Sequence, residues 1–198
     1  MNAVLAGATG LVGSHIARLA GPGLLTLQRG DYAKLDSLTA SSVDRVYCAL
    51  GTTMRQAGSQ EAFRQVDYGY VLALARWARA QGATDFRLVS SVGAAPSSSN
   101  FYLRVKGETE RDLATLGFTS LQIFRPGVLL GERKESRAGE SIGRAFSLAF
   151  GPLLLGPLAK YRATKAEDVA RAMVTWPAPP GVHIYHQPDL FSQKGHDS

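Results

Sequence analysis

The chain has 198 residues, of which 45% are hydrophobic and 19% are charged, and its formal net charge is +6. This balance predicts one folded domain and excludes an intrinsically disordered chain. A single cysteine excludes an internal disulfide framework, and no apolar run reaches the roughly 18 residues of a membrane-spanning helix. Lysines and arginines are scattered rather than gathered in one block, so we expect no nucleic-acid partner. We expect a cytoplasmic protein.

Short β-rich runs alternate with longer helical runs along the chain, which is typical of an α/β fold with a doubly wound parallel sheet. The candidate strands are residues 3–5, 24–27, 45–50, 86–90, 120–124 and 183–186. The candidate helices begin near Leu11 and at residues 61–80, 101–116, 141–150 and 165–176. Thr164 is the expected N-cap of the last helix. We expect a single domain over residues 1–191, with a small substrate-side segment near its C-terminal end, and a flexible tail over residues 192–198.

The stretch VLAGATGLVGSHIARLA, residues 4–20, has three glycines at intervals of three between a predicted strand and a predicted helix. A strand that enters a helix through such a loop presents free N–H groups and the positive helix end to a ligand. Gly7 would allow the tight turn, Gly10 the close approach of a pyrophosphate, and Gly13 the close packing of the helix on the sheet. The predicted dinucleotide-binding residues of this loop are Gly7, Thr9, Gly10, Leu11, Val12 and Gly13.

A second group of polar residues lies in the segment LVSSVGAAPSSSNFYLRVKGETE. Tyr102 and Lys106 are four residues apart, so on a helix they share one face. An ammonium group near a phenol favours the phenolate and helps the tyrosine to exchange a proton with a carbonyl or alcohol. Ser90 and Ser91 end an apolar strand at the carboxyl edge, where open α/β sheets bind their ligands. Either hydroxyl could hydrogen-bond a substrate oxygen.

Five motifs in order resemble the atypical short-chain dehydrogenase/reductases, and within them the Tat-interacting-protein (TIP30)-like NAD(P)-binding proteins and their bacterial relatives. These motifs are GATGLVGSHI, CALGTTMRQAGS, LVSSVGA, NFYLRVKGETE and IFRPGVLLGERKESRAGE. The resemblance implies a Rossmann-like fold in which Tyr102 is catalytic, Lys106 holds the nicotinamide ribose, and Ser91 or Ser90 orients the substrate. The further cofactor contacts that it implies are Leu50, Gly51, Thr52, Val128, Leu129 and Arg137.

The end of the second predicted strand bears on the choice of cofactor. An acidic residue there would bind the ribose diol of NAD, whereas an arginine accommodates the extra phosphate of NADP. The chain reads LLTLQRGDY, with no acid at Gln28 and with Arg29 next, which favours NADP, while Asp31 keeps NAD as an alternative. Only the run LLTL stands where the family has two strands. Either two strands are merged or an edge strand is lost on this adenosine side.

Three functions are consistent with these residues. The first is an NADP-dependent oxidoreductase that reduces a small carbonyl substrate through Ser91, Tyr102 and Lys106. The second is a non-catalytic NADP(H)-binding regulator or redox sensor that acts through protein partners. The third is a nucleotide-sugar epimerase or dehydratase, which the short segment after RPG disfavours. Aromatic residues at helical spacing in 64–80 favour a core position or a homodimer face. We expect no metal site, and we expect Cys48 to be a buried, inert thiol.

Overall fold

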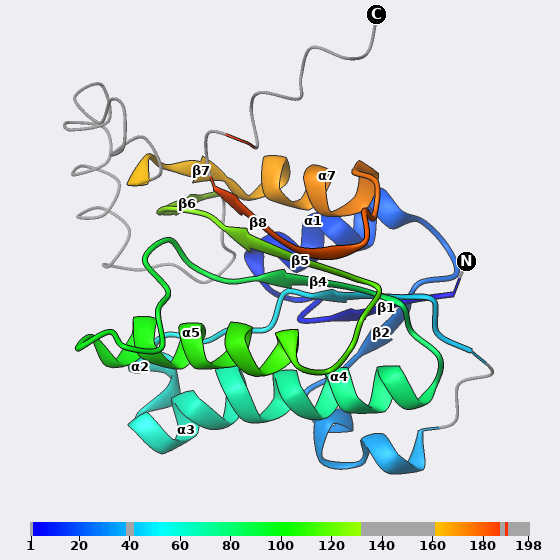
Figure 1. Cartoon of the computed structure of the whole chain (residues 1–198), viewed down its shortest axis with the longest axis horizontal. Helices are drawn as coiled ribbons and strands as arrows, with labels where there is room; N and C mark the ends of the chain where they lie inside the picture. Colours follow the sequence, from blue (N-terminus) through cyan, green and yellow to red (C-terminus); the bar gives the residue numbers. More distant parts are fainter. Residues whose placement is uncertain (1, 39–41, 132–160, 187–188, 190–198) are drawn as a thin grey trace, which may run out of the picture.

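Six parallel strands form the central sheet of the computed structural model, which describes residues 2–38, 42–131, 161–186 and 189. The strand order is β2-β1-β3-β4-β5-β8, and every neighbouring pair is parallel (Figure 1). The strands are β1 (Ala3–Ala6), β2 (Leu25–Leu27), β3 (Arg45–Cys48), β4 (Asp85–Val89), β5 (Ser120–Arg125) and β8 (Gly181–His186). Because all six run in the same direction, their carboxyl ends meet at one edge of the sheet.

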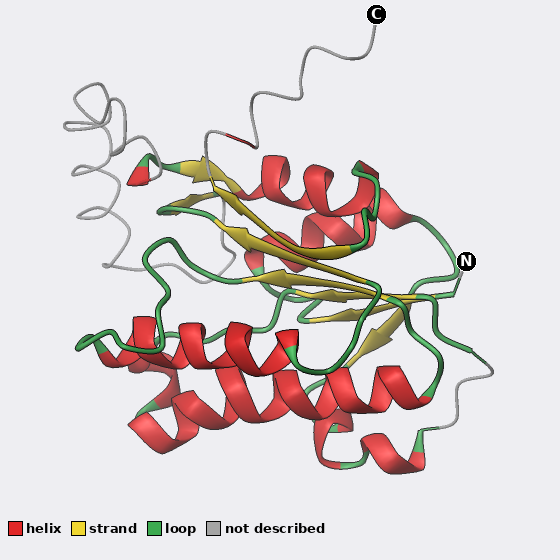
Figure 2. Cartoon of the chain, in the orientation of Figure 1, coloured by secondary structure: helices red, strands yellow, loops and turns green. Residues whose placement is uncertain are grey.

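Helices cover both faces of this sheet (Figures 1 and 2). On one face lie α1 (Leu11–Ala20) and α7 (Ala166–Thr175), and on the other lie α4 (Tyr70–Ala80) and α5 (Phe101–Ala114). Two short helices, α2 (Met54–Ala57) and α3 (Gln60–Arg64), precede α4, and a π-helical turn over Gln65–Gly69 joins α3 to α4. This arrangement confirms the predicted doubly wound α/β fold of one domain.

Successive side chains of the central strands point to opposite faces of the sheet. Both faces are therefore apolar and are covered by helices. In β1, Val4 and Ala6 contribute to the hydrophobic cluster under α4, whereas Leu5 contributes to the cluster under α1 and α7. In β4 all five residues are buried, as expected for a central parallel strand. The two apolar clusters therefore use opposite sides of the same strands.

Among the described residues, the segment between α1 and β3 has one strand, β2, in agreement with the single run LLTL of the sequence. Between β2 and β3 the described residues contain two 3-10 turns, Asp31–Ala33 and Leu35–Ser37, and no further strand. β2 is consequently the edge strand of the sheet.

Two short strands that the sequence did not predict lie beyond β5. Strand β6 (Leu129–Leu130) pairs in parallel with β7 (Thr164–Lys165). The prediction of Thr164 as a helix N-cap was wrong, because its backbone N–H donates to the carbonyl of Val128 at 2.9 Å and holds it in β7. Lys165 is the N-cap residue of α7, without a side-chain capping bond. The helix predicted over 141–150 lies outside the described residues.

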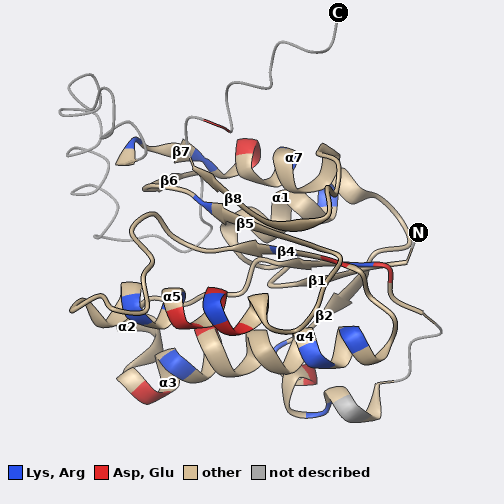
Figure 3. Ribbon diagram, viewed as in Figure 1, with Lys and Arg blue, Asp and Glu red and all other residues tan. Residues whose placement is uncertain are grey.

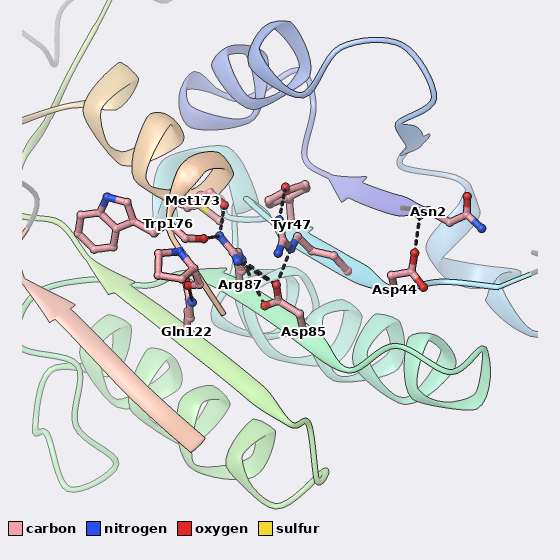
Figure 4. Close-up of polar contacts among 10 residues, drawn as sticks. Asn2, Asp44, Tyr47, Asp85, Arg87, Gln122, Met173 and Trp176 are labelled. Atoms are coloured by element: carbon pink, nitrogen blue, oxygen red, sulfur yellow. Dashed lines mark hydrogen bonds and ion pairs between the residues drawn. The ribbon is translucent and has the colours of Figure 1, made fainter. Parts of the chain in front are cut away.

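A buried arginine attaches α7 to the amino-terminal edge of the sheet (Figure 4). The Arg87 side chain is fully buried, and its Nη1 donates to the carbonyl oxygens of Met173 at 2.6 Å and Trp176 at 3.0 Å. Its Nη2 lies 2.9 Å from Oδ2 of Asp85, which also accepts from Arg45. The guanidinium thus satisfies carbonyl groups at the end of α7 that would otherwise lack partners. This cluster stabilises the fold at the edge opposite to the candidate site.

Candidate functional site

The glycine loop after β1 folds tightly against β3 and α1. Gly7 has a φ of +84°, and a Cβ on it would lie 2.5 Å from the carbonyl oxygen of Ala49. A Cβ on Gly13 would lie 2.0 Å from the carbonyl oxygen of Gly7. Both positions therefore require glycine for the backbone to pack as it does. These contacts support the roles predicted for the first and third glycines.

Gly10 differs from the other two glycines of the loop. Its backbone is extended, with φ −76° and ψ 170°, a conformation that any residue adopts. A Cβ there would meet the carbonyl oxygen of Gly7 at 3.2 Å and that of Ala49 at 3.9 Å. Packing within the fold therefore requires glycine only weakly at this position.

The N-terminus of α1 is suited to an anionic group. Its N-cap residue, Gly10, makes no side-chain capping bond, and the first turn contains no acidic residue. The N–H groups of a first helical turn lack intrahelical acceptors, and the helix dipole adds positive potential. Thr9 is exposed, Leu11 is half-buried and Val12 is buried. The loop therefore fits a pyrophosphate, in agreement with its glycine spacing.

Two more predicted segments reach the same region at the carboxyl edge. After β3, Leu50 is buried and Gly51 is exposed. A Cβ on Gly51 would lie 3.7 Å from Nζ of Lys106. Leu129 of β6 belongs to the same hydrophobic cluster as Leu11, and Val128 is 47% exposed. The structure thus brings the β3 loop and β6 beside the glycine loop and Lys106. Arg137 lies outside the described residues.

The turn after β2 separates the two residues on which the choice of cofactor depends. Oδ2 of Asp31 accepts from the backbone N–H of Gln28 at 2.6 Å, so this carboxylate closes the turn. Arg29 is exposed, and none of the ion pairs among the described residues includes it. Tyr32 follows in the core, where burial raises its pKa and its ring stacks on Tyr70 with centroids 5.3 Å apart.

One face of α5 carries the predicted catalytic pair. Tyr102 is half-buried and packs on Phe63 with ring centroids 5.6 Å apart, one helical turn before the buried Lys106. Nζ of Lys106 lies 2.8 Å from Oδ1 of Asp67. Burial alone would lower the pKa of Lys106, but the charge of Asp67 and the neighbouring Tyr102 outweigh it, and the pKa is raised above its ordinary value. Lys106 is therefore held as a cation next to Tyr102.

Asp67 is a site residue that the sequence analysis missed. It lies in the π-helical turn, is 1% exposed, and accepts from the backbone N–H of Thr52 at 2.9 Å. Phe63, Val71 and Leu74 are also fully buried on this helical segment, so Asp67 interrupts an apolar stripe. A carboxylate in such a stripe is costly to bury without a charged partner. That interruption was the sequence signal that could have identified it.

The two serines after β4 have different surroundings. The Ser90 hydroxyl is buried and donates to the carboxylate of Glu110, one turn beyond Lys106 on α5. Glu110 also accepts from Nε of Arg125 at 3.0 Å. Ser91 is half-buried, and its hydroxyl donates to the adjacent carbonyl of Val92 at 3.3 Å. The hydroxyl of Ser90 is therefore engaged with a charged group, whereas that of Ser91 has only a local bond.

Charge elsewhere on the molecule is distributed over several helices and strands. Figure 3 shows lysine and arginine segments interspersed with acidic ones on both layers of helices. Among the described residues, no helix has the length and apolarity needed to cross a membrane.

Comparison with curated proteins identifies close relatives, although no protein-family profile matches the chain. The chain is 44% identical over 153 residues to Protein HTATIP2 of Rattus norvegicus, an alignment that covers 76% of this chain and 61% of that protein. It is 39% identical over 170 residues to the mitochondrial Protein FMP52 of Candida albicans, covering 73% of this chain and 74% of the relative. For the Aspergillus niger relative the identity is 36% over 201 residues, with 87% and 85% covered. This chain thus spans less than two thirds of the rat protein.

These relatives overturn the expectation of a cytoplasmic protein. FMP52 relatives from Candida albicans, Debaryomyces hansenii and Aspergillus niger are named as mitochondrial. The expectation was based on composition and on the absence of long apolar runs. Both properties are common to folded proteins of several compartments, so they do not distinguish between them.

Solved structures with the same fold include nucleotide-sugar enzymes. The UDP-glucose 4-epimerase of Thermotoga maritima, solved with UDP-glucose, has a TM-score of 0.67 at 16% identity and covers 100% of this chain and 84% of that one. RMD from Pseudomonas aeruginosa, solved with NADPH, has a TM-score of 0.64 at 19% identity, with 94% and 78% covered. At these identities the likeness shows the fold, and the curated relatives show the family. The chain belongs to the family of HTATIP2 and FMP52 proteins, which is of the atypical short-chain dehydrogenase/reductase type.

Proposed function

We propose that this protein is an NADP(H)-dependent oxidoreductase that reduces a small carbonyl substrate. The observation that carries the proposal is the charged, buried Lys106 one turn from Tyr102, with the glycine loop at the same sheet edge. Neighbours in the same fold support the cofactor class, since WbmH of Bordetella bronchiseptica was solved with NAD+ and RMD with NADPH.

In this proposal, three segments hold the cofactor. The loop over residues 7–13 binds the pyrophosphate through the N–H groups of α1. Leu50, Gly51 and Thr52 would contact the adenosine half, and Val128 and Leu129 would contact the nicotinamide half. When bound, the cofactor supplies a hydride for the carbonyl carbon.

Side chains of this protein supply the proton that the carbonyl oxygen of the substrate takes up. The Tyr102 hydroxyl, one helical turn from the cation of Lys106, gives its proton to the carbonyl oxygen as the general acid. The Ser91 hydroxyl donates a hydrogen bond to the same oxygen as negative charge develops there. We choose Ser91 because the hydroxyl of Ser90 is already bound to Glu110. The product is an alcohol, and Tyr102 regains a proton from solvent.

Preference for NADP over NAD follows from the turn after β2. Arg29 is exposed there and can pair with a phosphate, whereas the carboxylate of Asp31 is bound to the backbone of Gln28. An acid engaged in this way is poorly placed to bind a ribose diol, so the alternative with NAD is the weaker one.

A second candidate is a non-catalytic NADP(H)-binding regulator or redox sensor that acts through protein partners. It is favoured by the shortened adenosine side, where the described residues have 3-10 turns in place of a strand. The third candidate, a nucleotide-sugar epimerase or dehydratase, rests on the shared fold and on the Tyr102 and Lys106 pair, an arrangement that such enzymes share.

Substitution Tyr102→Phe tests the proposed chemistry. We expect it to abolish NADPH-dependent reduction across a panel of small aldehydes and ketones while NADPH affinity stays within a few fold, because only the proton donor is lost. Tyr68→Phe is the matched control, since its hydroxyl donates to Asp112 of α5 at 2.8 Å and not to Lys106 or Tyr102. Undiminished turnover in Tyr102→Phe would remove Tyr102 from the reaction. NADPH binding without turnover of any panel member by the unsubstituted protein would favour the regulator.

A further inference from the structure

We propose that Asp67 is a positioning residue that links Lys106 to the loop after β3, so that the lysine and this loop act as one cofactor-binding unit. The inference rests on the proposed function. Asp67 lies in the π-helical turn, whereas Lys106 lies in α5 and Thr52 lies in the loop after β3.

The two carboxylate oxygens of Asp67 are used on two different elements. Oδ1 lies 2.8 Å from Nζ of Lys106 on α5, and Oδ2 accepts from the backbone N–H of Thr52 at 2.9 Å. The intervening Gly51 lies against the pair, since a Cβ on it would be 3.5 Å from Oδ1 of Asp67. The side chains of Asp67 and Lys106 are 0% and 6% exposed. One buried carboxylate therefore determines where both cofactor-facing groups lie.

The backbone of Asp67 is itself fixed by the helix in which it lies. The π-helical turn over Gln65–Gly69 widens the helix at this point, and such turns occur frequently at functional sites. The Thr109 hydroxyl of α5 donates to the carbonyl oxygen of Asp67 at 3.0 Å. Both the side chain and the main chain of Asp67 are thus attached to α5.

This geometry leaves part of Lys106 available. An ammonium group has three donors, of which the contact with Asp67 uses one, so two remain for hydroxyl groups of a ligand or of Tyr102. An asparagine at position 67 cannot replace the aspartate. It would present its NH2 group to one of two donors, either Nζ of Lys106 or the N–H of Thr52.

The charge of Asp67 also supports its role in holding Lys106. The titratable groups that act on Lys106 are Asp67 from the π-helical turn, Tyr102 from α5 and Cys48 from β3. Burial raises the pKa of the Cys48 thiol to about 12, so this thiol supplies no charge at neutral pH, and Asp67 is the carboxylate that pairs with Lys106. Without Asp67 the burial of Lys106 is uncompensated and lowers its pKa.

The test is fluorescence titration of NADPH into the full chain from pH 7 to 9. With Asp67 in place, we expect the affinity to be nearly constant over this range. We expect Asp67→Asn to weaken NADPH binding by about tenfold or more, increasingly so toward pH 9, as Lys106 loses its proton. Asp85→Asn is the matched control, because Asp85 is also buried and paired with arginines but at the opposite edge of the sheet. It should change NADPH affinity by less than about twofold, since distant sites rarely couple.

A double-mutant cycle with Lys106→Met separates positioning from a general loss of structure. If Asp67 acts through Lys106, adding Asp67→Asn to Lys106→Met produces little further loss of affinity. Equal affinities for Asp67→Asn and the unsubstituted protein, or fully additive losses in the cycle, would overturn the inference and leave the proposed function intact. If Asp67→Asn does not fold, a marked loss of NADPH affinity between pH 7 and 9 in the unsubstituted protein would overturn it. Failure of the unsubstituted protein to bind NADPH at any pH would overturn the proposed function, and this inference with it.

Discussion

Substitution Gly10→Ala shows whether glycine at this position is required for stability or for binding of the cofactor. The backbone of Gly10 is compatible with alanine, and the added Cβ would be 3.2 Å from the carbonyl oxygen of Gly7. A neighbour at this distance needs to move by only a few tenths of an ångström. At Gly13, by contrast, the same Cβ would be 2.0 Å from that oxygen, so the loop or α1 must shift.

The expected magnitudes follow from these contacts. Gly10 is the N-cap of α1, where alanine is less favourable than glycine, so Gly10→Ala should lower the free energy of unfolding by about 0.5–1 kcal/mol. Gly13→Ala should lower it by about 1–3 kcal/mol or more, as overpacking does. For NADPH affinity, in contrast to stability, we expect Gly10→Ala to have a large effect. A methyl group at position 10 keeps the phosphates from the N–H groups of the loop, and losing one or two charge-assisted bonds weakens binding by about tenfold to a hundredfold.

Urea unfolding and NADPH titration on both variants measure the two effects independently. We expect Gly10→Ala to remain folded with strongly reduced NADPH affinity. If Gly10→Ala binds NADPH as tightly as the unsubstituted protein, the phosphates do not approach Gly10 and the assignment of this loop is wrong. A loss of stability for Gly10→Ala as large as that for Gly13→Ala would refute the reasoning from the Cβ contacts.

Two further predictions concern stability. Arg87→Met leaves the buried Asp85 with one arginine fewer and removes two hydrogen bonds to the end of α7. The free energy of unfolding, measured in urea, should therefore fall by about 3–5 kcal/mol. A loss under about 1 kcal/mol would contradict the role of this cluster. Burial raises the pKa of the Cys48 thiol from 9.0 to about 12. The unfolded thiol therefore loses its proton first as the pH rises, and stability decreases between pH 9 and 12 by up to about 1.4 kcal/mol per pH unit from this group. Cys48→Ala should remove that part of the slope, and identical slopes for both proteins would refute the assignment.

Local sequence patterns predicted the parts of the protein that depend on local structure. The glycine spacing after a short apolar run predicted a strand, a tight loop and a helix, and the structure has β1, the loop and α1 at these positions. The run LLTL predicted one strand on the adenosine side, and β2 is the strand described there. In both cases the backbone requirement lies within a few residues of the pattern that predicts it. The Tyr102 and Lys106 pair is placed on one helix for the same reason.

Contacts between distant segments were not predictable in this way. The partner of Asp67 is 39 residues further along the chain, and the surrounding aromatic and aliphatic residues indicated only a core position or a homodimer face. The choice between Ser90 and Ser91 depends on Glu110, which approaches from α5. Strand β7 forms only because Val128 lies beside Thr164, so the threonine that local propensity favours as a cap pairs as a strand instead. Each of these outcomes is decided by tertiary packing, which overrides local preference.

Calorimetric titration of the unsubstituted protein with NADPH, and separately with NADH, tests the central claim most directly. The account predicts micromolar binding of NADPH and much weaker binding of NADH, because the glycine loop holds the pyrophosphate of either nucleotide and Arg29 pairs only with the extra phosphate. Equal binding of the two would remove Arg29 from cofactor selection. Absence of binding by both would contradict the account, since the loop and the Lys106 site would then not form a nicotinamide dinucleotide site.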